Sequence, residues 1–110
     1  MNIKFQPRDL GIWLDIIDMN CLNAADADRL AAFDIDDDSD LERLIVEWIK
    51  PRFEENDAQN RSEMMAILEQ SKQWTTKQLQ PVFAEVGIPS GQEVEDIDRF
   101  MGALRRQILG

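Results

Sequence analysis

The sequence predicts an all-α protein, a single compact domain of five to six helices packed as a bundle or an orthogonal array. Apolar residues recur along the whole chain at the three- and four-residue spacing of one helical face. Capping residues and helix breakers separate these apolar series. No segment alternates apolar and polar residues as a half-buried strand does, so only residues 1–6 are left as a possible extended stretch.

The length and composition predict one domain that covers residues 1–110. A chain of 110 residues with 44% apolar residues can build one modest core without disulfides or metals. Charged residues make up 31% of the chain, but three tryptophans and five phenylalanines are more than a disordered chain carries. We therefore expect the chain to fold.

The first helix is expected to begin near Leu10 and to be substantially buried. Its apolar face is formed by Leu10, Trp13, Leu14, Ile17 and Cys21. We expect Cys21, on this face, to be a small buried hydrophobe rather than a reactive thiol. Asn23 is a favourable N-cap for a second, alanine-rich helix through about Phe33, with Asp26 in its first turn.

The third helix has the clearest signal. Ser39 and Glu42 form the serine-x-x-glutamate capping box, and an apolar helical series follows at once. Pro51 is expected to kink or end this helix after Lys50, because proline lacks the amide hydrogen and clashes with the preceding turn. Residues 54–60 are then expected to form a polar connection.

The second half of the chain predicts three more helices. Asn60 is expected to cap the fourth, and Thr75 or Thr76 the fifth, which should continue across Pro81 with a kink. Trp13, Trp48 and Trp74 are expected to anchor three different helices in the core.

The last helix should be preceded by a clear stop signal. Gly87 is expected to take the left-handed conformation after the fifth helix, because glycine adopts it without steric cost. Ser90 and Glu93 then repeat the capping box, and Glu95 with Arg99 has the spacing of a favourable ion pair.

The negative charge is concentrated in the middle of the chain. The protein has 22 acidic and 12 basic residues, a net charge of −10, and residues 34–63 hold eleven acids and four bases. Such a field repels nucleic acid and anionic lipid, and it attracts basic proteins or cations. We therefore expect no direct contact with nucleic acid.

The sequence also predicts a cytoplasmic protein outside the membrane. Asp9 and Asp15 interrupt the only early apolar run, so no leader of the basic-then-apolar kind is recognisable. The single cysteine excludes an intramolecular disulfide. No uncharged apolar run approaches the roughly 18 residues of a membrane span.

The aspartate run 34–40 has the alternation of a calcium-binding EF-hand loop but fails in both registers. Counted from Asp34, Ser39 stands where the loop needs glycine, and Ile45 where it needs a bidentate glutamate. Counted from Asp36, Leu41 takes the glycine position. A solvated loop that starts the third helix is the simpler interpretation, and divalent-cation binding is kept as an alternative.

The residues needed for common catalytic sites are scarce. The chain has no histidine, no tyrosine and one cysteine, which excludes the usual zinc sites and histidine-based triads. Glycine-rich phosphate-binding loops are also missing from the sequence. We expect neither enzymatic activity nor a cofactor.

These observations predict a small acidic interaction protein, most simply an inhibitor or immunity-type protein, that docks a basic surface of a protein partner. The alternatives are a divalent-cation-binding protein that uses residues 34–40, and a helical adaptor or accessory subunit. The residues predicted to bind the partner are all acidic: Asp34, Asp36, Asp37, Asp38, Asp40, Glu42, Glu47, Glu54, Glu55 and Asp57.

Overall fold

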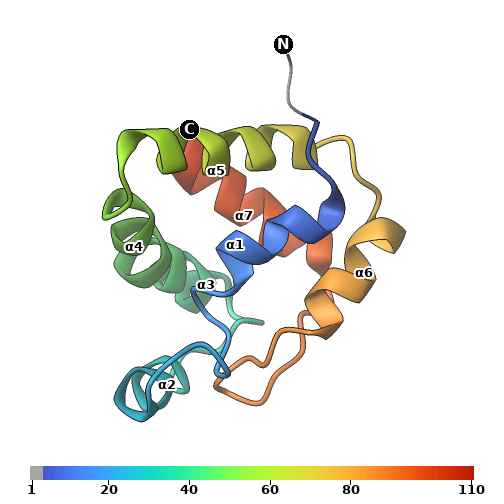
Figure 1. The fold of residues 1–110 in the computed structure, drawn as a ribbon. Helices are drawn as coiled ribbons and strands as arrows, with labels where there is room; N and C mark the ends of the chain where they lie inside the picture. Colours follow the sequence, from blue (N-terminus) through green and yellow to red (C-terminus); the bar gives the residue numbers. More distant parts are fainter. Residues whose placement is uncertain (1–3) are drawn as a thin grey trace.

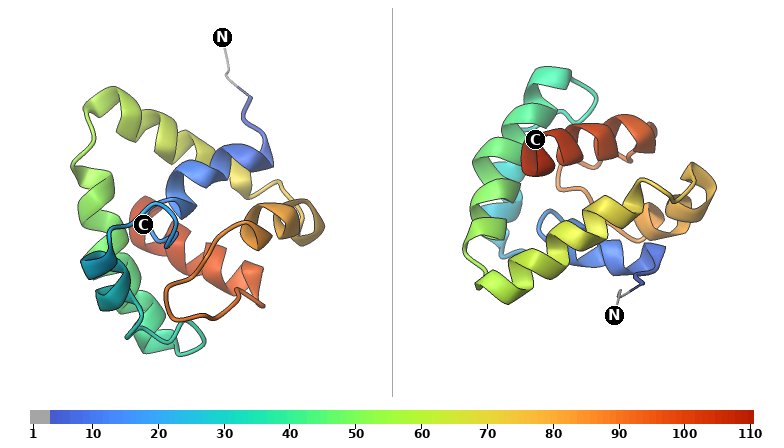
Figure 2. Two further views of the ribbon diagram at one scale, coloured as in Figure 1. Left: turned by 60° about the horizontal axis from the view of Figure 1, so that its bottom comes forward. Right: turned by 90° about the horizontal axis from the view of Figure 1, so that it is seen from above.

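The computed structural model describes residues 4–110 and confirms the all-α prediction (Figures 1 and 2). The described part of the chain forms one compact helical domain without strands. The expected extended stretch lies partly outside the described residues, and residues 4–6 have no regular structure. The elements are a 3-10 turn η1 (Pro7–Leu10), α1 (Gly11–Leu14), α2 (Ala24–Leu30), α3 (Asp38–Leu44), a π-helical segment η2 (Ile45–Ile49), α4 (Lys50–Glu54), α5 (Ala58–Ser71), α6 (Thr76–Ala84) and α7 (Ile97–Leu109).

Helix α7 lies at the centre of the domain. It packs against α3, η2, α5 and α6, and Figure 1 shows α1 crossing in front of it while α2 projects at the lower left. Its inward face is formed by Ile97, Phe100, Met101, Ala103 and Leu104, all buried. The Phe100 ring meets Phe83 of α6 edge to face, with 5.4 Å between ring centroids. The last helix of the sequence therefore organises the core.

Two of the three tryptophans are buried anchors, as predicted. The Trp13 ring stacks on Phe53 with 5.0 Å between centroids, and its indole N–H donates to the Met64 carbonyl oxygen at 2.9 Å. The Trp48 indole N–H donates to the Ile16 carbonyl oxygen at 3.0 Å. Trp74, after α5, is only half-buried and packs against the edge of the core.

The first helix is shorter than predicted, and the expectation for Cys21 was wrong. Helical structure ends at Leu14, and the chain then turns because the Met19 amide donates to the Gly87 carbonyl oxygen at 2.8 Å. Cys21 consequently leaves the apolar face and is exposed. The predicted cap of the next helix is confirmed, since Asn23 Oδ1 accepts from the Asp26 amide at 2.8 Å, although α2 ends at Leu30.

The cap of the third helix was assigned two residues too late. Asp37, not Ser39, caps α3, because its carboxylate accepts from the Asp40 amide at 2.9 Å. An aspartate N-cap is as effective as serine and adds a negative charge at the positive end of the helix.

Pro51 does not end the helix that contains it. The π-helical segment η2 comes directly before α4, and the Lys50 amide donates to the Ile45 carbonyl oxygen five residues back. This wider turn accompanies the passage through proline, which has no amide hydrogen for an α-helical bond and crowds the turn before it. Helical structure runs on to Glu54, and the polar connection shrinks to three residues before α5, whose cap is Asp57 rather than Asn60.

The ends of α6 and the start of α7 also test the predictions. Thr75 caps α6 in a capping box with Gln78, and the helix continues through Pro81, as expected. The expectation of a left-handed Gly87 was wrong, because the positive φ of this region is at Gly91 (81°). The Ser90 and Glu93 capping box is also wrong, since the N-cap of α7 is Asp96, six residues after Ser90.

The chain before α7 stays irregular because its side chains make other bonds. Asp96 caps α7 by accepting from the Arg99 amide at 3.0 Å. The Ser90 hydroxyl donates to Gln92 Oε1 instead of capping a helix. None of the helices formed by residues 4–110 combines the length and apolar character that a membrane span requires.

Candidate protein-interaction site

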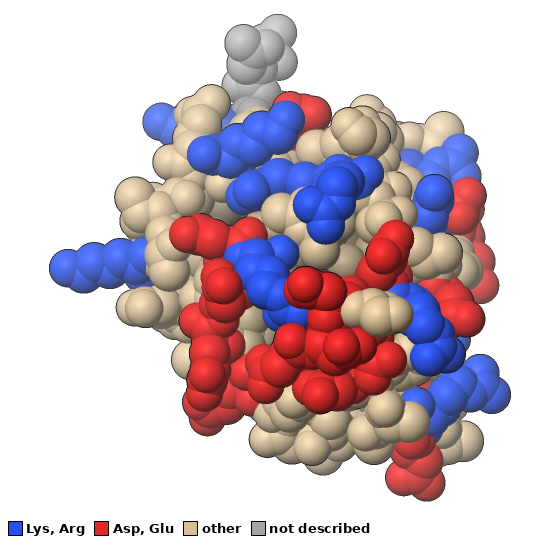
Figure 3. Space-filling view, turned by 180° about the vertical axis from the view of Figure 1, so that it is seen from behind, with Lys and Arg blue, Asp and Glu red and all other residues tan. Residues whose placement is uncertain are grey.

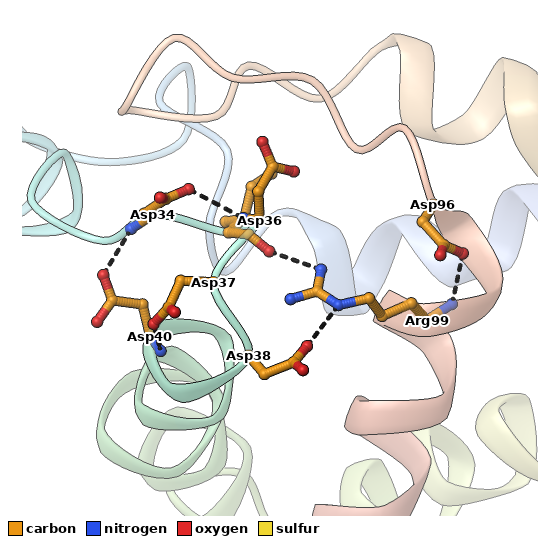
Figure 4. A network of polar contacts seen from close by, with 8 residues as sticks. Asp34, Asp36, Asp37, Asp38, Asp40, Asp96 and Arg99 are labelled. Atoms are coloured by element: carbon orange, nitrogen blue, oxygen red, sulfur yellow. Dashed lines mark hydrogen bonds and ion pairs between the residues drawn. The ribbon is translucent and has the colours of Figure 1, made fainter.

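The aspartate run forms a turn whose carboxylates bind the backbone of their own loop. The Asp34 amide donates to Asp40 Oδ2 at 3.0 Å, and the Asp36 amide donates to Asp34 Oδ1 at 3.0 Å (Figure 4). The Asp37 carboxylate caps α3, as described above. These bonds fix the loop and hold several carboxylates in defined positions on an exposed turn.

Two side chains from the other end of the sequence clamp this loop through Ile35. The Ile35 amide donates to Gln92 Oε1 at 3.0 Å, and its carbonyl oxygen accepts from Arg99 Nη1 at 2.8 Å. The Gln92 Nε2 group also donates to Asp34 Oδ1 at 2.7 Å and to Asp36 Oδ2 at 3.3 Å. Both backbone groups of the buried Ile35 are therefore satisfied by the segment around the start of α7.

Arg99 forms its ion pair with a residue that local spacing did not predict. Its Nε donates to Asp38 Oδ1 at 2.7 Å (Figure 4), so Asp38, and not the expected Glu95, is its ion-pair partner. The Nη2 atom of Arg99 is buried without a hydrogen-bond partner. Even in this ion pair the Asp38 side chain is 92% exposed, so its carboxylate still faces solvent.

The contacts around Gln92 change the ionisation of one carboxylate of the loop, Asp34. The hydrogen bond from Gln92 and the bond from the Asp36 amide, with the nearby Arg99 charge, lower the pKa of Asp34 below its ordinary value. The shift favours the charged form of Asp34.

A second acidic segment, which the sequence analysis did not treat as a site, lies beside the first. Residues 93–98 directly follow Gln92 and contain four exposed acids. Figure 3 shows carboxylates gathered over the middle and lower part of the face opposite to that of Figure 1, with basic side chains above them, along the borders and among them. We call the two segments together the acidic surface: Asp34, Asp36, Asp37, Asp38, Asp40, Glu42, Glu93, Glu95, Asp96 and Asp98.

The signal for the second segment was visible but was assigned to helix capping. The run from Glu93 to Asp98 holds four acids in six residues, close to the five in seven of residues 34–40. Two of its acids do have local roles: Asp96 caps α7, and Asp98 Oδ1 accepts from the Thr76 hydroxyl at 2.9 Å. Its proximity to residues 34–40 depends on contacts across 56 to 64 residues, which no local pattern contains.

The structure does not bring all ten predicted residues together. Glu42, the last residue of the first segment, accepts from Gln107 Nε2 at 3.2 Å, and Glu47, outside the acidic surface, pairs with Arg43 at 3.1 Å. The last three acids lie at the far end of the helical rod that α3, η2 and α4 form, after roughly 24 Å of helix at about 1.5 Å per residue. They are Glu54, Glu55 and Asp57.

The aspartate run does not form a preformed cation site. Within residues 4–110, the group of potential ligand atoms that converges to within 4.8 Å is Asp15, Asp18 and Cys21, not a set from the aspartate run. Desolvation, followed by the carboxylates of Asp15 and Asp18, raises the pKa of the Cys21 thiol, which disfavours the thiolate that a metal or an electrophile requires. Cation binding by residues 34–40 stays a prediction.

Asp18 in this group has a structural role. It is buried, and its Oδ1 accepts from the Asn20 amide at 3.0 Å and from the Gly87 amide at 3.2 Å. These bonds hold the turn after α1 against the segment that follows α6.

The comparisons with known proteins give no family assignment. The chain matches no protein-family model, and no curated protein or solved structure is significantly similar to it.

Proposed function

We propose that this protein is a non-enzymatic interaction protein, of the inhibitor or immunity type, whose acidic surface docks a basic surface of a protein partner. One observation carries the proposal: the fold holds two acidic segments side by side and fixes them to each other through Gln92 and Arg99. Residues 34–42 and 93–107 together contain ten acids and three arginines.

The basic residues of this region neutralise part of the surface, because Arg99 pairs with Asp38 and Arg43 pairs with Asp40 at 3.8 Å, but the acids still outnumber them. Arg99 is engaged with Asp38 and Ile35, and Arg105 turns inward, where its Nε and Nη2 donate to the Ser71 side chain and carbonyl oxygen at 3.0 and 3.1 Å. Arg106 is the remaining exposed cation among these three. A strongly negative potential therefore extends from this surface into solvent.

Such a surface favours fast and selective association with a basic partner. Complementary potentials raise association rates by about 10- to 1,000-fold and disfavour partners of the same sign. Because hydrogen bonds already hold the loop that carries the carboxylates, less conformational entropy is lost on binding than with a mobile acidic tail. As part of the same proposal we place the protein in the cytoplasm, where its free Cys21 would stay reduced.

The test begins with capture of a partner from the native cells and continues with stopped-flow association of the purified pair. The decisive variant is the triple replacement D36N/D37N/D38N. Asparagine is chosen because it caps helices as well as aspartate and keeps a hydrogen-bond acceptor at each position. We expect association to slow by about tenfold or more and to depend less steeply on salt.

The chain supplies a matched control in E54Q/E55Q/D57N. This variant removes the same three charges by the same isosteric chemistry, and Asp57 is also a helix cap that asparagine can replace. Its association rate should stay within about threefold of wild type, as expected for charges far from the contact at physiological salt. Equal rates for the two triple variants would reject the acidic surface as the docking site.

A further inference from the structure

A cleft of about 390 Å³ opens between α3 and α7, inside the acidic surface. Leu41 from α3 and Ala103 from α7 form an apolar floor, and both side chains are buried. Gly102 contributes no side chain, and a Cβ atom built there would meet nothing within 4 Å. The floor therefore offers apolar contact with open space above it.

The rim of this cleft is charged. Asp38 and Glu42 contribute carboxylates from α3, and Asp98 contributes one from α7. Glu42 and Asp98 each accept one hydrogen bond, from Gln107 and Thr76, while an ionised carboxylate can accept about four. Both therefore keep free acceptor sites toward the cleft.

Two arginines also line the cleft, with different availability. The Nε and Nη1 atoms of Arg99 are bonded to Asp38 and Ile35, while its Nη2 atom is buried without a hydrogen-bond partner. Arg106 stands in the last turn of α7 with no hydrogen bond or ion pair to another described residue, on a long and flexible side chain. The positive charge of Arg106 disfavours a bound cation, but its flexible side chain can move aside and leave the cleft open.

We propose that this cleft receives one long basic side chain, arginine or lysine, of the partner. The aliphatic stem would pack on Leu41 and Ala103 over Gly102, and the cationic head would bond Glu42 and Asp98. This inference rests on the proposed function, because it assigns an anchor to the same surface. Charge-assisted hydrogen bonds combined with a packed stem are the features of the few residues that dominate binding energy at an interface.

The charge of the surroundings selects a cation over an anion. Asp38 and Arg99 are paired with each other, so the two remaining carboxylates of the rim, Glu42 and Asp98, stand against Arg106, and the wider acidic surface adds negative potential. A carboxylate or phosphate ligand would have to approach Arg106 through that field. Anion binding is therefore the competing outcome of the test.

The experiment uses the full chain labelled with ¹⁵N and three short peptides that differ only at their central residue. That residue is arginine, lysine or citrulline, which has nearly the shape of arginine without its charge. We expect the amide signals of Gly102 and Ala103 to shift with the arginine and lysine peptides and not with the citrulline peptide. The tighter binding of one of these two peptides shows whether the cleft prefers arginine or lysine.

Filling the cleft should abolish this binding. Gly102→Leu places a side chain in the open space and should weaken binding at least tenfold. Gly11→Leu is the matched control, because a Cβ at Gly11 also meets nothing within 4 Å and Gly11 does not line this cleft. Thermal melting of both variants verifies that each is folded.

The sign of the Arg106 effect decides between a cation and an anion. Arg106→Gln should strengthen binding of the arginine peptide about threefold, as expected for removing one like charge near the site in water. Weaker binding of that peptide, or shifts of the same amides with inorganic phosphate, would overturn the inference. So would the absence of any shift at millimolar peptide.

The two variants distinguish an error in the cleft proposal from an error in the proposed docking surface. If D36N/D37N/D38N slows association with the purified partner while Gly102→Leu leaves its affinity unchanged, the acidic surface stands and the cleft is not its anchor. If neither variant has an effect, both proposals are rejected.

Discussion

The two ends of one helical rod, formed by α3, η2 and α4, carry similar acids but organise them differently. At the start of the rod, the aspartate turn is tied to its own backbone and to Gln92 and Arg99 from distant sequence. At the other end, Asp57 caps α5, while the carboxylates of Glu54 and Glu55 bond no other described residue. Arg61 bonds only the backbone carbonyl oxygens there.

The two ends therefore differ in whether hydrogen bonds fix the positions of their carboxylates. Both ends contribute to the negative field of the molecule, which acts over about a Debye length of 8 Å at physiological salt. The first end also has fixed carboxylates, a second acidic segment beside them and an adjoining cleft. We therefore propose docking at the first end. The first two predictions below compare the two ends, and the other two concern the first end.

Replacing the two arginines should show the largest difference. Arg99→Met removes an ion pair and a hydrogen bond to the Ile35 carbonyl oxygen, and it should lower the free energy of unfolding by about 2–3 kcal/mol. Arg61→Met removes bonds between neighbours in sequence and should cost about 1 kcal/mol. Urea unfolding of the two variants measures both values. Equal losses would show that the clamp of the acidic loop is no stronger than a local bond.

Replacing the caps should show that the two ends are alike in local structure. Asp37→Ala and Asp57→Ala should each lower the free energy of unfolding by about 1 kcal/mol, since each removes an aspartate N-cap. Ser39→Ala should change it by less than about 0.5 kcal/mol, because Ser39 is an exposed first-turn residue. A larger loss for Ser39→Ala than for Asp37→Ala would restore the capping box predicted from the sequence.

A smaller gain is expected from Gly102→Ala beside the acidic surface. Alanine is better than glycine in a helix by about 0.5–1 kcal/mol, and the added Cβ has free space. Thermal unfolding should therefore show a higher midpoint. At Gly87 the same change should give no gain, because the new Cβ would lie 2.8 Å from Met19 Cγ. A lower midpoint for Gly102→Ala would mean that the cleft is not open.

The smallest expected effect is the acid sensitivity contributed by Asp34. Its folded-state pKa is lowered, so its contribution to stability is complete above the unfolded pKa of about 3.9 and disappears as the pH falls through the lower folded value. Asp34→Asn keeps the acceptor but cannot titrate. It should lose less stability than wild type between pH 5 and pH 2, measured by urea midpoints at constant salt. A loss as large as that of wild type would contradict this role.

Much of the local structure could be predicted from sequence because it depends on near neighbours. The caps by Asn23 and Thr75 were correct, as were the apolar faces that bury Trp13 and Trp48. Errors arose where several residues competed for one cap. Asp37, Ser39 and Asp40 are all acceptable near a helix start; in the structure the Asp37 carboxylate caps the helix, while the Asp40 carboxylate accepts from the Asp34 amide.

The sequence by itself determined the helical class, the apolar faces and the concentration of acid around residues 34–40, because helical periodicity and net charge are properties of near neighbours and of composition. The tertiary structure decided that a second acidic segment lies beside the first. Only the packing of α7 against α3 brings Arg99 to Asp38 and opens the cleft between them. Contacts across some sixty residues depend on how every intervening helix packs, and no local pattern records that.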